Sequence, residues 1–412
     1  MHRVVITGRG IISPIGNEVE LFWKNLKAGV SGITTIDSFD ASQFGTKIAG
    51  IVRDFDPEAL FGRKDARKMD RFSQFGLYAA KKAIEDADLD VDTIDRERFG
   101  VYVGTGIGGI ETLTDNYDAF LNRGPGRVSP SLVPMMISNM AAAQISIHFG
   151  ALGPTLSPVT ACSIGNTAIG EAFRMIRSGE ADIIIAGGTE AAIHPLSLAS
   201  FGNATALSRR NDEPERASRP FDGTRDGFVM GEGAGIVVLE SLEHATRRGA
   251  KIHGEVIGYG ASSDAYHVVA SHPEGDGALL AMKRALQSAG VGPLDIDVVS
   301  AHATSTVVGD LAETKALKRL FGEDVYKVPV TANKSMLGHM FGAAGGAAAI
   351  ALLESLKEGI IPPTMNLEHR DAECDLDYVP NAARTANLQI GLSNSFGFGG
   401  HNAVIILKKY SE

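Results

Sequence analysis

Short runs of apolar residues recur along the chain, with helical stretches between many of them. The residues in each run are hydrophobic at successive positions, a pattern typical of strands that are buried on both faces. Such strands, with helices between them, indicate a largely parallel sheet that is covered by helices on both sides. We therefore predict an α/β fold. The runs are Val101–Val103, Ile183–Ala186, Gly235–Leu239, Val298–Val299 and Ala403–Leu407.

A weak internal duplication is visible in the order of these elements. In the first half, a strand near Val101–Gly104 precedes a helix that begins at Cys162, and another strand follows that helix. In the second half, a strand near Asp297–His302 precedes a helix of small residues within Met336–Ile350. Two similar α/β halves would place one helix from each half side by side in the middle of the molecule. We expect the halves to be residues 1–252 and 253–412.

The composition is ordinary for a globular protein and excludes several function classes. The 412 residues are 44% hydrophobic and 21% charged, and the formal net charge of −10 would repel nucleic acid. No apolar run approaches the roughly 18 residues needed to span a bilayer, and the N-terminus lacks the features of a signal peptide. The two cysteines lack metal-ligand spacing and fit a reducing compartment, so we expect a cytoplasmic protein without a membrane segment.

Cys162 is the strongest candidate for a catalytic nucleophile. It lies where an extended segment, Ser157–Ala161, runs into a helix of small residues. A thiol at a helix N-terminus faces unpaired backbone N–H groups and the positive end of the helix dipole, which lower the thiol pKa. The alternative is that Cys162 is a small buried hydrophobic residue, the commonest fate of a free cysteine. Cys374 has acidic neighbours and no such setting, so we expect it to be inert.

Two of the eleven histidines have surroundings that suggest a site. His302 ends a predicted strand, and α/β folds tend to build their sites at the C-terminal ends of strands. His339 follows Lys334 and precedes the small-residue run Gly342–Ala349, which would allow close approach of the backbone. A lone histidine is more often structural than catalytic, so these positions need support from the rest of the chain.

Six segments provide that support, because together and in this order they resemble one family. They are Thr160–Ser163 (TACS), Ser218–Asp222 (SRPFD), Arg225–Gly235 (RDGFVMGEGAG), His302–Thr306 (HATST), Lys334–His339 (KSMLGH) and Asn394–Gly400 (NSFGFGG). The chain resembles the β-ketoacyl-acyl-carrier-protein synthases, in particular the synthase II type, from Val4 almost to its C-terminus. One such motif alone would be weak evidence, whereas several in the same order are specific.

The resemblance implies a thiolase-like fold, in which two topologically similar halves form five α/β/α/β/α layers, usually in a homodimer. It also implies an acyltransferase of fatty acid elongation. Such an enzyme moves an acyl group from a carrier thioester to a cysteine and decarboxylates malonyl-acyl-carrier-protein. The resulting carbanion equivalent then attacks the acyl group in a Claisen condensation. The cysteine would lie in the N-terminal half and the two histidines in the C-terminal half.

The resemblance assigns each candidate a role in this reaction. Cys162 would carry the acyl group, and its backbone N–H and that of Phe398 would bind the tetrahedral oxyanion. His302 and His339, as neutral imidazoles, would donate N–H groups to the enolate, where a preorganised donor contributes roughly 3–4 kcal/mol. Lys334 would support the second histidine through an ion pair, for which the candidate partners are Asp310 and Glu313.

Substrate contacts follow from the same resemblance. Thr304 and Thr306 would bind the pantetheine amide, Ile107 would line the acyl pocket, and Phe398 would act as a gate. The acyl carrier protein is acidic, so a basic patch should border the entrance of the site. We expect this patch at Lys64, Arg67 and Lys68.

Two departures from the family pattern bear on cofactors. Many relatives have asparagine two residues before the first histidine and glutamate in the helix after the second, and both positions are associated with a buried cation. This chain has Ser300 and Ala348 there. Because the cage would lack its charged ligand, we expect neither a metal nor another cofactor.

These departures leave other functions open. One is a ketosynthase of polyketide or other secondary metabolism. A more distant one is a catalytically silent subunit of the chain-length-factor kind, against which the presence of Cys162 argues. A Cys-His hydrolase is a third, but two histidines with Lys334 favour condensation.

Overall fold

One ten-stranded sheet runs through the computed structural model, which describes residues 1–411. Its strands are β1 (Val4–Ile12), β4 (Phe99–Gly104), β5 (Thr155–Leu156), β6 (Ile183–Glu190), β7 (Gly233–Ser241), β8 (Gly254–Ser263), β9 (Val298–Ser300), β10 (Val330–Thr331), β13 (Ile390–Gly397) and β14 (His401–Lys408). The strand order is β10-β9-β13-β14-β8-β1-β7-β6-β4-β5. Two small pairs lie outside this sheet, β2 (Ile33–Thr35) with β3 (Ile48–Gly50) and β11 (Ile360–Ile361) with β12 (Arg384–Thr385).

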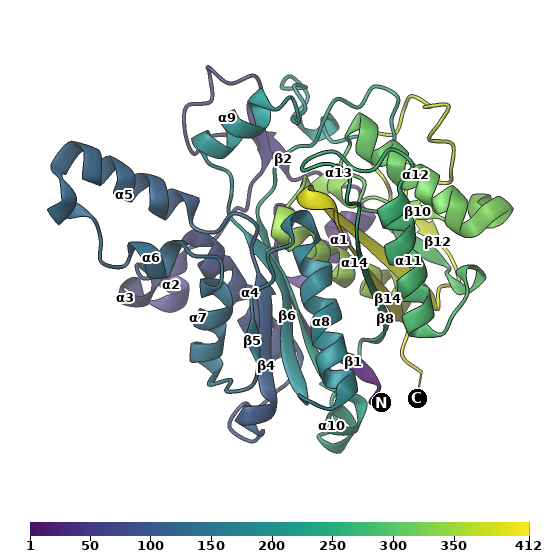
Figure 1. Ribbon diagram of the computed structural model, residues 1–412, viewed down its shortest axis with the longest axis horizontal. Helices are drawn as coiled ribbons and strands as arrows, with labels where there is room; N and C mark the ends of the chain where they lie inside the picture. Colours follow the sequence, from purple (N-terminus) through teal and green to yellow (C-terminus); the bar gives the residue numbers. More distant parts are fainter. Residues whose placement is uncertain (412) are drawn as a thin grey trace.

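The helices cover the sheet in layers. They are α1 (Val19–Lys27), α2 (Pro57–Phe61), α3 (Arg63–Ala66), α4 (Arg71–Asp86), α5 (Ile110–Arg123), α6 (Leu132–Met136), α7 (Met140–Phe149), α8 (Ile164–Ser178), α9 (Pro195–Asn203), α10 (Leu242–Arg247), α11 (Asp276–Ala289), α12 (Val307–Phe321), α13 (Lys334–Leu337) and α14 (Ala344–Glu358). Helices α8 and α14 pack between the two halves of the sheet, with α4 and α7 outside one half and α11 and α12 outside the other (Figure 1). This confirms the predicted five-layered α/β fold.

The two halves of the sheet repeat one topology. The order β5-β4-β6-β7-β1 in the first half corresponds to β10-β9-β13-β14-β8 in the second, with the same relative strand directions. The antiparallel pair of β1 and β8 joins the halves at the centre. The fold therefore consists of two similar halves, as predicted.

The expectation of a largely parallel sheet is wrong, because the sheet is mixed. Strands β7 and β14 each run antiparallel to both of their neighbours. A strand that is covered on both faces is apolar whichever way it runs, so the hydrophobic pattern does not report its direction. The sequence pattern also missed β13, whose buried residues include the polar Ser393, Asn394 and Ser395.

Glycines allow the central helices to touch. A Cβ atom on Gly165, in the first turn of α8, would overlap the backbone of Gly345 and Gly346 at the start of α14. A Cβ atom on Gly346 would in turn overlap the carbonyl group of Gly235 in β7. This contact brings together the N-terminal ends of two helices from different halves of the chain.

In the described residues, no helix is long and apolar enough to cross a bilayer.

Replacing Gly165 with alanine should therefore destabilise the fold. An added methyl group in this close contact must push the two helices apart, and such overpacking costs about 1–3 kcal/mol. Urea denaturation of Gly165→Ala should show this loss in the free energy of unfolding. Gly202 in α9 is the matched control, because its Cβ position is open. Gly202→Ala should leave that free energy unchanged or raise it by up to about 1 kcal/mol.

Candidate active site

Cys162 lies in a tight turn, Ala161–Ser163, that leads directly into α8. Ala161 has a φ of 51°, which is unfavourable for a residue with a side chain and is typical of strain stored at functional sites. The loop after β13 packs closely on this turn, since a Cβ atom on Gly397 would lie 3.0 Å from the Cys162 nitrogen. The predicted position of Cys162 at a helix start is therefore confirmed.

A cavity of about 190 Å³ brings Cys162 together with both predicted histidines. His302 follows β9, and His339 lies between α13 and the turn before α14. The cavity thus collects residues from both halves of the chain. Its other lining residues are Ala206, Phe228, Val269, Ala270, Ser271, Thr304, Thr306, Val308, Gly309, Phe341, Phe396, Gly397 and Phe398.

The two imidazoles lie next to each other and are uncharged. Their ring centres are 5.5 Å apart, and the ring planes are nearly perpendicular. Burial and the nearby charge of Lys334 hold the pKa of His302 and of His339 well below the usual value. In the described residues, neither ring makes a hydrogen bond, so both are available to a substrate. Each neutral ring carries one N–H group that can donate.

Backbone contacts fix the position of both histidines. The His302 N–H donates to Glu313 Oε1 at 2.9 Å, and Lys334 Nζ donates to the His302 carbonyl at 2.5 Å. The His339 N–H donates to the carbonyl of Val229 at 2.7 Å. His302 is therefore held through both its N–H and its carbonyl group, and His339 is held by the other half of the chain.

The expected ion pair between Lys334 and a carboxylate is not formed in the described residues. Glu313 instead accepts hydrogen bonds from the N–H groups of His302 and Ala303 and from the Asn394 amide, which satisfy both of its buried oxygens. Asp310 accepts from the N–H groups of Phe221 and Ser305 and lies 3.7 Å from Arg225. Burial lowers the pKa of Lys334 to about 8, although Glu313 and Asp310 oppose this at longer range.

The resting Cys162 is a thiol, contrary to the expectation of a lowered pKa. Burial raises the pKa of Cys162 to about 12. The charge of Lys334 and the backbone N–H groups of Phe398 and Cys162 lower it, but they do not outweigh the loss of hydration. The helix position identified the residue correctly, whereas its burial determines the protonation state.

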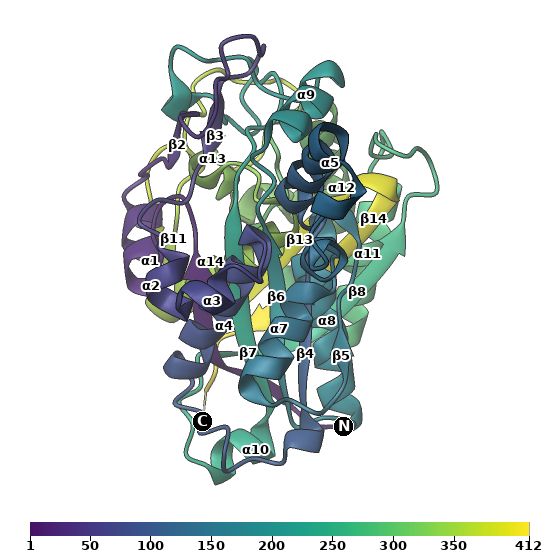
Figure 2. The same ribbon diagram turned by 90° about the vertical axis from the view of Figure 1, so that its left-hand side faces the viewer.

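The remaining predicted residues divide into two groups. Thr304, Thr306 and Phe398 line the cavity, and the two threonine hydroxyls are 3.0 Å apart. Ile107 does not line it and is 37% exposed. The docking candidates Lys64, Arg67 and Lys68 are exposed on and after α3, which lies well away from α12 at the cavity in both views (Figures 1 and 2). Within one chain these basic residues do not border the cavity.

Sequence reasoning missed several residues of the site. Phe228, Phe341 and Phe396 form aromatic walls around the imidazoles. Phe228 lies within the motif Arg225–Gly235, and Phe341 follows His339 by two residues. Their positions in the sequence could therefore have indicated that they lie near the site. Glu190 at the end of β6 was also missed, and its negative charge raises the pKa of Cys162.

The residues at the two departures from the family pattern do not fit a hard-cation cage. Ser300 and Ala348 are buried and offer a hydroxyl and a methyl group in place of an amide and a carboxylate. Hard cations prefer several oxygen ligands, among them carboxylates. Within residues 1–411, no group of three or more His, Cys, Asp or Glu side chains is arranged to hold a metal ion.

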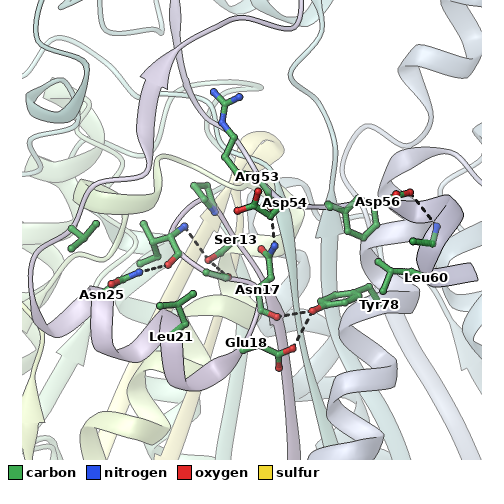
Figure 3. Close-up of a pocket in the computed structure, with 16 residues that line it drawn as sticks. Ser13, Asn17, Glu18, Leu21, Asn25, Arg53, Asp54, Asp56, Leu60 and Tyr78 are labelled. Carbon is green, nitrogen blue, oxygen red and sulfur yellow. Dashed lines mark hydrogen bonds between the residues drawn. The ribbon is translucent and has the colours of Figure 1, made fainter.

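A second cavity, of about 560 Å³, is larger but has different chemistry. Figure 3 shows its polar side chains bonded to the protein itself: Asn17 donates to the Arg53 carbonyl, and Tyr78 donates to the Asn17 carbonyl. Among the described residues, no cysteine or histidine lines it. The cavity that contains Cys162 is therefore the candidate active site.

Comparisons with known proteins agree with this site. The family description "Beta-ketoacyl synthase, N-terminal domain" matches residues 1–245, and "Beta-ketoacyl synthase, C-terminal domain" matches residues 253–368. The chain is 49% identical to "3-oxoacyl-[acyl-carrier-protein] synthase 2" of Synechocystis sp. over 408 residues, which are 99% of this chain and 98% of that protein.

Solved structures agree as well. A beta-ketoacyl synthase from Burkholderia phymatum has a TM-score of 0.94 and 35% identity, and all of both chains is covered. A type II polyketide synthase ketosynthase, solved in complex with its acyl-carrier protein, has a TM-score of 0.91 and 33% identity over 99% of this chain and 100% of that one. The motif-based resemblance is therefore confirmed.

The raised pKa of Cys162 predicts an unusual alkylation profile. Only the thiolate reacts with iodoacetamide, so the rate should rise about tenfold per pH unit from about pH 7 to 10 without reaching a plateau. Stopped-time mass spectrometry of the intact protein measures this rate, and Cys162→Ala gives the background from Cys374. A plateau below pH 9 would contradict the raised pKa.

Proposed function

The chain belongs to the β-ketoacyl synthase family, and we propose that it condenses a Cys162-bound acyl group with malonyl-acyl-carrier-protein in fatty acid elongation. One observation carries this proposal: a buried thiol and two neutral imidazoles from different halves of the chain share one cavity. A hydrolase needs an imidazole that accepts the thiol proton beside a water, whereas two neutral donors suit an enolate. Membership of the family supports the same reaction.

The first step is transfer of the acyl group to Cys162. The sulfur attacks the thioester carbonyl of the acyl carrier, and the bond from that carbonyl to the carrier sulfur breaks. The Cys162 proton leaves with the departing carrier thiolate, so no lasting ion pair is needed. The N–H groups of Cys162 and Phe398, which face the sulfur, are placed to stabilise the oxyanion that forms beside it.

The second step is decarboxylation followed by condensation. The bond between the malonyl carboxylate and its α-carbon breaks, carbon dioxide leaves, and the electron pair forms an enolate. N–H groups of His302 and His339 stabilise the enolate oxygen, and Thr304 and Thr306 hold the pantetheine arm. The enolate carbon then attacks the Cys162 thioester, and the thiolate that leaves takes up a proton.

The same chemistry would serve a polyketide ketosynthase, which is the second candidate. The structural likeness to such a protein favours it. The sequence favours fatty acid elongation, because the identity is 49% to the 3-oxoacyl-[acyl-carrier-protein] synthase 2 but 33% to the polyketide ketosynthase. A silent subunit is disfavoured by the intact set of Cys162, His302 and His339.

We propose that the protein is a homodimer. Exposed apolar side chains gather between residues 107 and 159, on α5, α6, α7 and the edge strand β5. Helix α5 projects from the body of the molecule (Figure 1). A concentration of exposed apolar side chains of this kind supports an interface, and a second copy would cover it. The side chains are Ile107, Leu113, Tyr117, Phe120, Leu121, Val133, Ile147, Leu152, Leu156 and Val159.

Binding of an acyl carrier protein is proposed at exposed basic residues. Lys64 makes no ion pair in the described residues, while Arg67 and Lys68 lie near Glu58 and Asp65 at 3.5 and 3.2 Å. Arg209 is exposed three residues beyond Ala206, which lines the cavity, and so lies nearer the entrance. An acidic carrier would be attracted to both places.

Two buried free cysteines also support the expected cytoplasmic location.

Variants of the nucleophile and of one histidine should separate the two steps. With acyl-carrier and malonyl-carrier substrates, Cys162→Ala should form no acyl-enzyme and no product but should still release some carbon dioxide. His339→Ala should form the acyl-enzyme and lose at least about 100-fold in carbon dioxide release, as expected on loss of one preorganised donor. Intact-protein mass spectrometry and carbon dioxide detection report the two steps, and elongation by Cys162→Ala would exclude the assigned nucleophile.

A charge in the apolar face should separate the subunits. Leu121 is 60% exposed on α5, and Leu121→Asp should shift the mass measured by sedimentation from the dimer to 43.4 kDa. The reason is that a carboxylate buried at an apolar interface loses its hydration. Leu294→Asp is the control, because Leu294 is 71% exposed in the other half of the chain. A wild-type protein that sediments as a monomer would refute the dimer.

A further inference from the structure

Glu190 is a fully buried carboxylate beside the active site that the reaction described above does not use. Its Oε1 accepts from the Thr105 hydroxyl at 2.7 Å and from the Ile107 N–H at 3.1 Å. Its Oε2 accepts from the N–H groups of Gly106 at 2.9 Å and Gly342 at 3.1 Å. Among residues 1–411 no cation pairs with it, so four hydrogen bonds satisfy the carboxylate.

These contacts suit a carboxylate, which accepts hydrogen bonds on both of its oxygens. Three of its four partners are backbone N–H groups, which can only donate. A glutamine would direct its NH₂ group at one or two of these backbone N–H groups, whichever way its amide is turned. The surroundings therefore disfavour a glutamine at this position. Burial raises the pKa of Glu190, and the same four donors oppose that rise.

Glu190 also connects segments with different roles. Thr105, Gly106 and Ile107 belong to the loop after β4, whereas Gly342 lies in the turn that follows His339. The carboxylate thus joins a loop of the first half to the imidazole-bearing segment of the second. Its charge acts on the Cys162 sulfur with a sign opposite to that of Lys334.

We propose that Glu190 is a positioning residue that fixes the loop of Thr105–Ile107 to the turn after His339. The proposal rests on the proposed function for the roles of His339 and Cys162. A thiol that ionises only when an acyl carbonyl occupies the neighbouring N–H groups discriminates against small electrophiles and oxidants, which react with free thiolates. A negative charge on Glu190 adds to the effect of burial, which keeps the resting Cys162 in this state.

Iodoacetamide alkylation of Cys162 tests the effect of the Glu190 charge on the thiol. The measurement needs no substrate, so it does not depend on the proposed reaction. In Glu190→Gln the negative charge is removed, so the pH profile should shift to lower pH, and alkylation at a fixed pH should be roughly three- to tenfold faster. Glu190→Asp keeps the charge but shortens the reach. It should retain the wild-type alkylation profile and lose roughly tenfold or more in the kcat of condensation.

Glu240→Gln is the matched control. Glu240 is also fully buried and lies at the opposite end of the β6–β7 strand pair, where Arg248 and Thr7 bind it. This variant should lower stability without moving the alkylation profile. The proposal is overturned if folded Glu190→Gln reproduces the wild-type profile, if Glu240→Gln shifts it equally, or if Glu190→Asp retains full kcat. A shifted profile in a protein that does not condense acyl groups would instead refute the proposed function alone.

Discussion

The close contact between α8 and α14 is the constraint on which the site depends. Each helix begins directly after a short turn, and the turns carry Cys162 in one half and follow His339 in the other. Because glycines let the two helix starts approach, these segments meet at one cavity. Neither half could build the site alone, so the site exists only where the two halves of the fold meet.

Burial then shifts the pKa of Cys162 and of both histidines in the cavity, and that of Lys334 beside them. It lowers the pKa of Lys334 and of both histidines and raises that of Cys162, so three of these four groups are neutral at rest. In such a weakly polarisable environment the remaining charges act strongly. Lys334 and Glu190 act on the sulfur with opposite sign. The site is therefore organised for charge that appears only during the reaction.

Much of this arrangement could be predicted from the sequence, for reasons that individual residues make clear. The apolar runs that became β4, β6, β7, β9 and β14 were recognisable because both faces of each are buried. Strand direction could not be predicted, because a strand buried on both faces is apolar whichever way it runs. Strand β13 could not be recognised, because it contains polar residues such as Asn394, whose side chain donates to Glu313. The motifs located Cys162 and the histidines. Only the structure shows that burial raises the pKa of Cys162 by more than its position at a helix start lowers it. Only the structure, too, shows that Glu313 accepts from the His302 N–H and forms no ion pair with Lys334, which donates to the His302 carbonyl.

The turns before the two central helices are also equivalent to each other. Ala161 has a φ of 51° and Phe341 a φ of 46°, so the residue after each occupies the same place at a helix start. That residue is Cys162 in one half and Gly342 in the other, whose N–H binds the Glu190 carboxylate. One copy of the turn thus binds a side-chain carboxyl group within the resting protein, whereas the N–H of the other is placed to bind the oxyanion of the proposed reaction. The same turn therefore holds the structure together in one half of the fold and serves the chemistry in the other.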